Sequence, residues 1–291
     1  MAKRLVIVNP ASRRARHESF CSRLAREIRA QGGGYDIVTS RSAAHAGVLA
    51  REAAAQRYDA VVAVGGDGLV NHVARELVGS ETALGIVPAG VGNDFARGVG
   101  LPLRLTEACR VVASGRVRAL DVGSANGRYF FSVAVIGLAA EVNRRANRLR
   151  RFHLPKLYML TTLATVFAYK PRCFTVSGDG HEGSYYGWMI AAGNTWSCAA
   201  GMALLPAARP DDALLDVCVI GALGRGQLLL AFPRVFLGSH VYHKGVEMMR
   251  VKSLAVSADA PCDLYADGER LGSLPVMLSV VPGALRVITP A

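Results

Sequence analysis

Residues 58–68, YDAVVAVGGDG, are the stretch that decides the fold. The apolar, valine-rich first part is typical of a buried strand in a parallel sheet. Gly65, Gly66 and Gly68 then allow a tight turn and a close approach of the backbone to a ligand. A helix is predicted over 69–77, and the free N–H groups at its start favour an anion. The stretch therefore predicts a phosphate cradle, and the alternative is a glycine-rich turn that binds nothing.

The glycine loop matches neither of two familiar nucleotide motifs. It lacks the Gly-Lys-Ser/Thr of a P-loop, and it lacks the GxGxxG of dinucleotide-binding folds. An acidic residue, Asp67, lies inside the loop instead.

Composition narrows the class of protein. The chain has 291 residues, of which 51% are hydrophobic, so it can form one large domain or two ordinary ones. A net charge of +12 suggests an anionic partner, although a basic surface on an ordinary globular protein is the alternative. Six cysteines without a CxxC pair argue against a zinc site or a disulfide framework. The first apolar run is too short for a signal peptide and no run reaches about 18 apolar residues, so we expect a cytoplasmic protein, with peripheral membrane contact allowed.

The first 120 residues alternate strand and helix signals. Strands are predicted over 5–8, 35–39, 58–64 and 83–87, and helices over 17–30, 44–56, 69–78 and from 93 onward. This alternation predicts an α/β domain with a doubly wound, Rossmann-like parallel sheet. Asn9-Pro10, Ser40, Gly65–Gly68 and Gly90–Asn93 each follow a strand, so four loops should meet at the carboxyl edge of the sheet.

The second half has a different texture. Residues 119–125 and 128–136 flank Asn126-Gly127, a strong hairpin signal. Strand-like runs follow at 172–178, 184–193, 214–221, 246–257, 262–266 and 276–289, with helical insertions at 154–169 and 227–237. We therefore expect an α/β nucleotide-binding domain over 1–121 and a β-rich domain over 122–291, whose last strand could return to the first domain.

A second informative loop is residues 88–97, PAGVGNDFAR. Asn93 or Asp94 could cap the helix that follows, and a simple capped helix start is one interpretation. When residues 88–97 are considered together with the 65–68 loop, a second ligand-binding loop is the better interpretation.

Seven motifs in order carry a resemblance to a known family. They are NPAS (9–12), GGDGLVN (65–71), PAGVGNDFAR (88–97), DVGSANG (121–127), GN (193–194), PAARPDDALLD (206–216) and DGE (267–269). The chain resembles the bacterial diacylglycerol kinase and lipid kinase family, whose catalytic domain is shared with sphingosine and ceramide kinases. That resemblance implies an NAD kinase-like fold, with the active site between a nucleotide domain and a β-rich domain. NAD kinases share the GGDG loop but not the GNDFAR stretch.

The resemblance also implies roles for individual residues. Glu269 matches the general base that takes the proton of a lipid hydroxyl, and Asp267 would support the base or a metal. Asp212, with backbone groups at Arg209 and Leu214, matches a structural Mg²⁺ site. The residues that would contact ATP are Asn9, Pro10, Ser12, Ser40, Gly65, Gly66, Asp67, Gly68, Asn71, Gly90, Val91, Asn93 and Asp94.

The implied function is a lipid kinase that uses ATP and Mg²⁺. It would transfer the γ-phosphate of ATP to a lipid hydroxyl, with diacylglycerol as the default substrate and a sphingoid or other lipid alcohol left open. Backbone N–H groups and Mg²⁺ neutralise phosphates in such reactions, and a carboxylate orients the attacking hydroxyl. By themselves Asp267-Gly268 would indicate only a hairpin turn, and Asp211-Asp212 only a solvated turn.

Four positions depart from the family pattern. Leu69 and Val91 stand where threonines are usual, His72 stands where a glutamate is usual, and Ala213 replaces a glycine. Leu69 is expected to crowd the first helical turn, and Ala213 matters if its turn requires positive φ. Each missing hydroxyl removes a phosphate hydrogen bond worth about 1.5–3 kcal/mol. The alternative function is therefore a catalytically impaired paralogue that binds nucleotide or lipid.

The region 144–170 is basic and then apolar. Its cations are Arg144, Arg145, Arg148, Arg150, Arg151 and Lys156, and leucines at 157, 160 and 163 follow. The pattern is typical of an interfacial helix on an anionic membrane, and an ordinary packed helix with a basic edge is the alternative. Aromatic residues are not interleaved with the cations, which argues against nucleic acid. We expect a lipid partner at an anionic membrane surface, no nucleic acid, and an oligomeric state in which a homodimer is one candidate.

Overall fold

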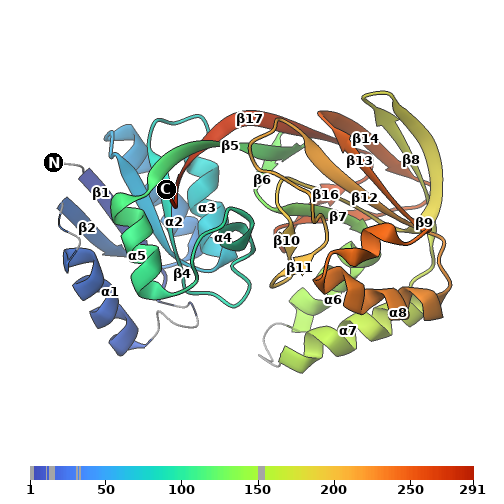
Figure 1. Ribbon diagram of the computed structural model, residues 1–291, viewed down its shortest axis with the longest axis horizontal. Coiled ribbons are helices and arrows are strands. Elements are labelled where there is room, and N and C mark those ends of the chain that lie inside the picture. Colours follow the sequence, from blue (N-terminus) through green and yellow to red (C-terminus); the bar gives the residue numbers. More distant parts are fainter. Residues whose placement is uncertain (1–2, 11, 13–16, 31, 33, 150–154) are drawn as a thin grey trace.

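The computed structural model describes residues 3–10, 12, 17–30, 32, 34–149 and 155–291. The N-terminal part is a parallel sheet between two helical layers (Figure 1). Its strands are β1 (Lys3–Val8), β2 (Gly34–Thr39), β3 (Ala60–Gly65) and β4 (Ala83–Pro88), in the order β2-β1-β3-β4. Its helices are α1 (Glu18–Ala30), α2 (Ala43–Ala55), α3 (Asp67–Leu77), α4 (Asp94–Gly98) and α5 (Leu105–Ser114). The doubly wound α/β prediction is confirmed.

The layers follow from the sequence. Every residue of β3 is buried, because its valines and alanines face helices on both sides of the sheet. Helices α2 and α3 cover one face and α1 and α5 cover the other. At the edge of the sheet, β2 is mostly exposed, and among the described strands it pairs only with β1.

The second part is a β-rich, mainly antiparallel domain with helices on one side, as predicted. Its strands are β5 (Arg116–Ala125), β6 (Arg128–Phe130), β7 (Val133–Gly137), β8 (Arg172–Gly178), β9 (His181–Gly193), β10 (Ser197–Cys198), β11 (Met202–Ala203), β12 (Leu215–Gly221), β13 (Val246–Val251), β14 (Ser253–Ala258), β15 (Asp263–Ala266), β16 (Glu269–Ser273) and β17 (Val276–Thr289). Its helices are α6 (Leu138–Leu149), α7 (Pro155–Ala168), α8 (Arg225–Phe236) and the short 3₁₀ helix η2 (Ser239–Tyr242). Alternate residues of β7 pack into different clusters: Ala134 and Ile136 lie in the core between strands, and Val133 and Val135 lie toward the helices.

Two strand predictions needed correction. The run 128–136 is broken into β6 and β7, because the backbone N–H groups at 131 and 132 leave the ladder to bond a carboxylate. The run 246–257 is two strands: β13 pairs with β12, whereas β14 pairs with β8 and β17. The turn at Asn126-Gly127 has positive φ at both residues, and that hairpin is confirmed.

The helix expected over 154–169 is confirmed as α7, whereas the first cations of the basic region lie on a separate helix. Residues 138–149 form α6 and residues 155–168 form α7, and the two helices contact each other. Arg150 and Arg151, two of the six expected cations, lie outside the described residues. Among the described residues, no helix is both long and apolar enough to cross a membrane.

Strands β5 and β17 connect the two parts. They run antiparallel to each other along their length, in green and red across the top of Figure 1. The first residues of β5 and the last residues of β17 belong to the N-terminal sheet, where Val287 pairs with Leu84 of β4. The other ends belong to the β-rich domain. The expected boundary at residue 121 thus falls inside β5, which is continuous across it.

Candidate functional site

The two glycine loops pack backbone against backbone. The Ala89 N–H donates to the Gly65 carbonyl at 2.8 Å, which sets the second loop beside the first. A Cβ on Gly90 would lie 2.5 Å from the Gly66 Cα, and one on Gly66 would lie 3.0 Å from the Gly90 Cα. Only glycine fits at both positions, so the loops form one unit.

Asp67 holds the second loop in place. Its carboxylate accepts hydrogen bonds from the backbone N–H groups of Asn93 at 2.7 Å and Asp94 at 2.6 Å. Burial raises the pKa of Asp67, as does the charge of Asp94, while these backbone hydrogen bonds act in the opposite direction. The first free N–H groups of α4 are therefore capped by Asp67. Neither Asn93 nor Asp94 makes a side-chain cap there, which corrects the sequence-based interpretation.

Asn93 shapes the second loop from within. Its backbone is left-handed, with φ of 52°, and its side-chain oxygen accepts the Gly90 N–H at 3.0 Å. The side-chain amide of Asn93 donates back to the Gly90 carbonyl at 3.2 Å. The carboxylate of Asp94 reaches the second domain, where it accepts hydrogen bonds from the Ser197 hydroxyl at 2.6 Å and the Ala200 N–H at 3.0 Å. The second loop therefore contacts both domains.

The Asp267-Gly268 turn carries two candidate carboxylates, Asp267 and Glu269. Both residues have positive φ, as a tight hairpin requires, so the hairpin interpretation is correct. The Asp267 carboxylate accepts the N–H groups of Phe131 at 2.8 Å and Ser132 at 2.9 Å. Burial raises the pKa of Asp267 to about 6, and these hydrogen bonds limit the rise. Asp267 thus fixes the turn against the start of β7.

Glu269 meets the helix that begins at the glycine loop. The Arg75 guanidinium NH1 lies 3.2 Å from Glu269 Oε2, and His72 Nε2 lies 3.8 Å from Glu269 Oε1. Both partners lie on α3, whereas Glu269 begins β16 in the other domain. The candidate base is therefore held by the helix that begins at the glycine loop.

Buried polar side chains lie on α3 and just after β9. Among the described residues, Asn71 Nδ2, Thr195 Oγ1 and both side-chain polar atoms of Asn194 are buried without a hydrogen-bond partner. A buried polar atom without a partner costs about 1–3 kcal/mol, so such a group needs an explanation. Burial and the nearby charges of Asp94, Asp267 and Asp67 all raise the pKa of Cys198. The carboxylates of Asp67, Asp94 and Asp267 therefore all lie near Cys198.

The remaining predicted nucleotide contacts lie in different surroundings. Ser12 is buried and its hydroxyl has no partner among the described residues. The Ser40 hydroxyl bonds the Val8 carbonyl at 3.3 Å, so it fastens the end of β1. Asn9 follows β1 and its N–H donates to the Val64 carbonyl, and Pro10 is exposed beside it. Gly68 has open space where a Cβ would point.

Leu69 and Val91, which stand where the family usually has threonine, lie in opposite environments. Val91 is 66% exposed at the tip of the second loop. Leu69 is 2% exposed and lies in the core. A Cβ on Gly65 would be 2.6 Å from a Leu69 methyl, so glycine at 65 makes room for the bulky side chain.

The expected metal position lies elsewhere, beside β12 and β13. The Arg250 guanidinium forms an ion pair with Asp212 Oδ2, and the Leu214 N–H donates to Asp212 Oδ1 at 3.2 Å. No cluster of three metal-binding side chains is found among the described residues. In this structure a guanidinium therefore neutralises Asp212. The backbone at Ala213 has φ of 59°, so the turn does require the left-handed region, and Arg209 lies in the same loop.

Three site residues were not assigned a role from the sequence: Arg75, Asn194 and Thr195. The Gly193-Asn194 motif was a signal for Asn194. Arg75 lies three residues after His72 on one face of α3, which is a weaker signal.

Comparisons with known proteins identify the family of the chain. Residues 3–125 match the family model described as the diacylglycerol kinase catalytic domain, and residues 132–289 match the YegS C-terminal NAD kinase beta sandwich-like domain. A diacylglycerol kinase of Mycobacterium tuberculosis (strain H37Rv) is 37% identical over 249 residues, which cover 83% of this chain and 80% of that protein. A Pseudomonas aeruginosa (strain PAO1) protein named probable lipid kinase YegS-like is 34% identical over 253 residues, covering 84% and 80%.

Solved structures show the same fold. A crystal structure of a diacylglycerol kinase from Bacillus anthracis (strain Sterne) superimposes with a TM-score of 0.77 at 20% identity, covering 99% of this chain and 97% of that one. The NAD kinase-like relation expected for the second domain is confirmed by the family model. The chain belongs to the diacylglycerol kinase family of lipid kinases.

Proposed function

We propose that the protein transfers the γ-phosphate of ATP to the hydroxyl of a lipid alcohol, with diacylglycerol as the default substrate. The observation that carries this proposal is the contact of Glu269 with α3. One helix begins at the candidate phosphate loop and, two turns later, holds the candidate base. A phosphate on the loop and a hydroxyl at the base would therefore approach each other in the same cleft.

The glycine loops would bind the triphosphate through backbone N–H groups and the dipole of α3. ATP would enter as its magnesium complex, so that this ion belongs to the substrate and supplies charge neutralisation. No second, structural magnesium is proposed, since Arg250 already pairs with Asp212.

Glu269 would accept the proton of the lipid hydroxyl. The hydroxyl oxygen attacks the γ-phosphorus, the bond to the β,γ-bridging oxygen breaks, and ADP leaves with that oxygen. Arg75 would assist, because its NH2 is buried and has no hydrogen-bond partner among the described residues. A guanidinium nitrogen there can donate to an oxygen of the transferred phosphate. Asp267 would keep the turn of Glu269 rigid.

The lipid substrate implies work at a membrane surface, and we propose that the protein binds there peripherally. The net charge of +12 supports an anionic surface.

Glu269→Gln tests the proposed base. The variant should transfer no measurable label from [γ-³²P]ATP to a mixed lipid extract, because glutamine cannot accept the proton, while calorimetry should give unchanged MgATP binding. Glu182→Gln, on an exposed part of β9, is the matched control and should behave as the wild type. Wild-type turnover by Glu269→Gln would remove Glu269 from the base role.

The same assay tests the alternative function. A wild-type protein that labels no lipid and binds no ATP would be the impaired paralogue, an outcome motivated by the missing hydroxyls at Leu69 and Val91.

A further inference from the structure

A cationic cavity lies behind the hairpin that carries Glu269. It has a volume of about 600 Å³ and is formed by α6, the end of α7, the start of β8 and the β15–β16 hairpin. Five basic residues line it, against two acidic ones, Glu141 and Asp263. The basic residues are Arg144, Arg145, Lys170, Arg172 and Arg270.

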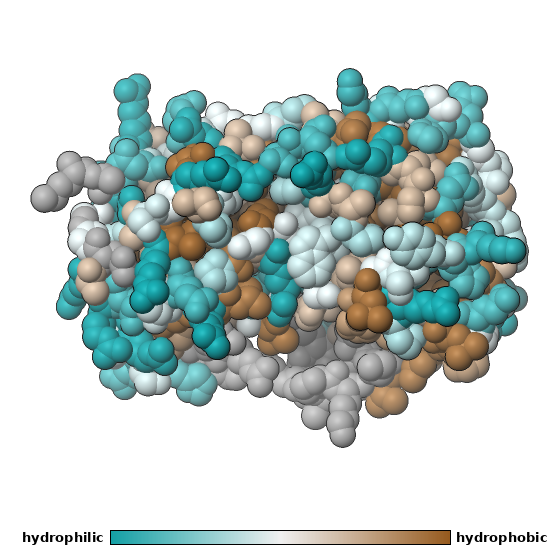
Figure 2. All heavy atoms as spheres, viewed as in Figure 1, coloured by the Kyte–Doolittle hydropathy of each residue, from teal (hydrophilic) through white to brown (hydrophobic). Residues whose placement is uncertain are grey.

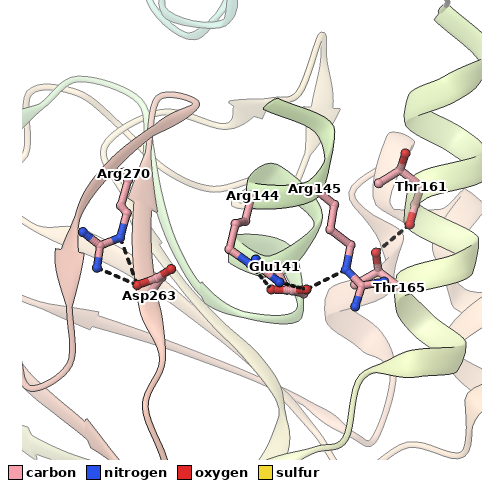
Figure 3. Close-up of polar contacts among 7 residues, drawn as sticks. All are labelled: Glu141, Arg144, Arg145, Thr161, Thr165, Asp263 and Arg270. Carbon is pink, nitrogen blue, oxygen red and sulfur yellow. Dashed lines mark hydrogen bonds and ion pairs between the residues drawn. The ribbon is translucent and has the colours of Figure 1, made fainter. Parts of the chain in front are cut away.

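Both acidic residues are already paired. Glu141 accepts hydrogen bonds at 2.6 Å from Arg144 and from Arg145, and the Arg144 bond is the largest of the influences that lower the pKa of Glu141. Asp263 pairs with Arg270 at 2.8 Å. Figure 3 shows Arg144, Arg145 and Glu141 on α6, with the Arg270–Asp263 pair on the neighbouring hairpin.

Lys170 and Arg172 are the surplus cations. Among the described residues, neither forms an ion pair with a carboxylate, and Arg172 Nε is buried without a hydrogen-bond partner. A buried guanidinium N–H without an acceptor is costly, because the desolvation of a charged group is not compensated. The cavity therefore carries positive charge that its own carboxylates do not neutralise.

Apolar side chains are exposed on the helices beside the cavity. Leu160, Leu163 and Phe167 of α7 are 60%, 38% and 62% exposed, and Leu230 and Leu237, in and just after α8, are 79% and 83% exposed. Helices α7 and α8 are joined where Arg225 donates to the Val166 and Tyr169 carbonyls. Figure 2 shows hydrophobic residues along the lower right edge, where Figure 1 draws α8.

The cavity is linked to the candidate active site. Asn147 of α6 donates to the Gly268 carbonyl at 2.9 Å, in the turn that precedes Glu269. Arg270, which lines the cavity, is the residue after Glu269. A ligand in the cavity would therefore contact the same hairpin and helix that fix the base.

We propose that this cavity binds the phosphate of an anionic glycerophospholipid headgroup and so seats the protein on the membrane. This inference deepens the proposed lipid kinase function and rests on it for its biological purpose. Guanidinium groups match phosphate oxygens in two-point hydrogen bonds, and the exposed apolar residues of α7 and α8 would enter the acyl boundary beside it. The bound phospholipid is a docking ligand, distinct from the lipid that receives the phosphate.

Vesicle flotation of the full chain tests the proposal. Wild-type protein should float with phosphatidylcholine vesicles that contain phosphatidylglycerol, and should bind poorly to phosphatidylcholine alone. Lys170→Gln/Arg172→Gln should bind the anionic vesicles about thirtyfold more weakly, given the usual contribution of each cation near a charged surface. Arg57→Gln/Lys252→Gln is the matched control: it removes two exposed cations outside the cavity and should change binding less than twofold.

Two further arms identify the ligand. Vesicles in which oleate replaces phosphatidylglycerol carry negative charge without phosphate, and the wild type should bind them more weakly at equal surface charge. Inorganic phosphate should not compete until it reaches millimolar concentrations. Equal loss of vesicle binding in the cavity and control variants would overturn the site, and tight binding of inorganic phosphate with unchanged vesicle binding would overturn the headgroup assignment.

Further measurements distinguish a loss of membrane docking from a loss of folding or of catalysis. Far-UV circular dichroism checks that the double variant is folded, and Lys170→Glu, at an exposed position, is a second variant that should weaken flotation by charge reversal. Activity on short-chain diacylglycerol in neutral detergent micelles should be the same in wild type and cavity variants. A wild type without kinase activity that still floats would refute the proposed function alone, whereas an active enzyme that does not float would refute the docking site alone.

Discussion

Val91 and Leu69 show that a missing hydroxyl matters differently in different surroundings. Val91 is exposed at the loop tip, so threonine would keep its shape and place a hydroxyl toward the candidate phosphate position. Leu69 is a core residue that fills the space left by Gly65. Sequence alone placed both residues at the nucleotide and could not tell that only one of them faces outward.

Val91→Thr should strengthen MgATP binding about tenfold, since one hydrogen bond to a charged phosphate is worth about 1.5 kcal/mol or more. Leu69→Thr should instead lower the free energy of unfolding by about 2–4 kcal/mol, because it leaves a cavity and buries a hydroxyl. Calorimetry and urea unfolding measure the two effects. Val48→Thr, at an exposed site on α2, is the control. An unchanged dissociation constant for Val91→Thr would argue that this loop does not contact phosphate.

At the level of elements, local sequence signals were sufficient to predict those turns and strands whose structure depends on residues close together in the chain. The glycine loop, the Asn126-Gly127 hairpin and strand β3 were all predictable, because turn residues and buried valines act within a few residues. The Arg75–Glu269 contact joins residues 194 positions apart, so no local pattern encodes it. Helix α6 was not predicted as a separate element, although its sequence LAAEVNRRANRL is rich in helix-forming residues.

Strand β12 contains a buried acid, Asp216, that makes stability depend on pH. It is 2% exposed; burial raises its pKa to about 6, the charge of Asp212 adds to the rise, and Arg250 opposes it. The unfolded chain releases this proton near its ordinary pKa of about 3.9. Between about pH 4 and 6 the native state therefore binds more protons, so this contribution to stability is greatest below pH 4 and is lost as pH rises through 6.

Asp216→Asn removes this titration. The variant should gain stability relative to the wild type as pH rises from 5 to 7.5, in urea unfolding at both values. The pKa of Asp267 is also raised, but Asp267 is present in both proteins. The difference in unfolding free energy between variant and wild type therefore reports on Asp216 alone. Asp259→Asn, at an exposed position, should show no such gain. If the free energy of unfolding differed between variant and wild type by the same amount at both pH values, the pH dependence could not be assigned to Asp216.

On the scale of the whole molecule, Asp121 fastens the ribbon of β5 and β17 to the loop that precedes β12. Its carboxylate accepts the Ala213 N–H at 2.7 Å and the Gly283 N–H at 2.8 Å, and its own N–H donates to the Pro210 carbonyl. The β17 ladder is irregular between Val281 and Leu285, where the strand passes from one domain to the other. Asp121 therefore stabilises the crossing point.

Asp121→Ala should lower the free energy of unfolding by about 3 kcal/mol, because two hydrogen bonds to a buried charge are lost. Both domains should be affected together. Trp188 and Trp196 report on the β-rich domain by fluorescence, and hydrogen exchange of β3 amides reports on the N-terminal sheet. Asp36→Ala, on the edge strand β2, serves as the control. A fluorescence shift with unchanged β3 exchange would show that the domains are independent.

The β5–β17 ribbon also has a consequence for the order of biosynthesis. The N-terminal sheet needs residues 285–289, which lie between β4 and the first part of β5. A ribosome that has made everything through β16 has therefore produced a nascent sheet with an open edge at β4, while the first part of β5 is still without its β17 partner. Such an edge can pair with other chains until it is covered. The step that closes the N-terminal sheet is thus the arrival of β17, a segment translated after every other strand of the β-rich domain described here.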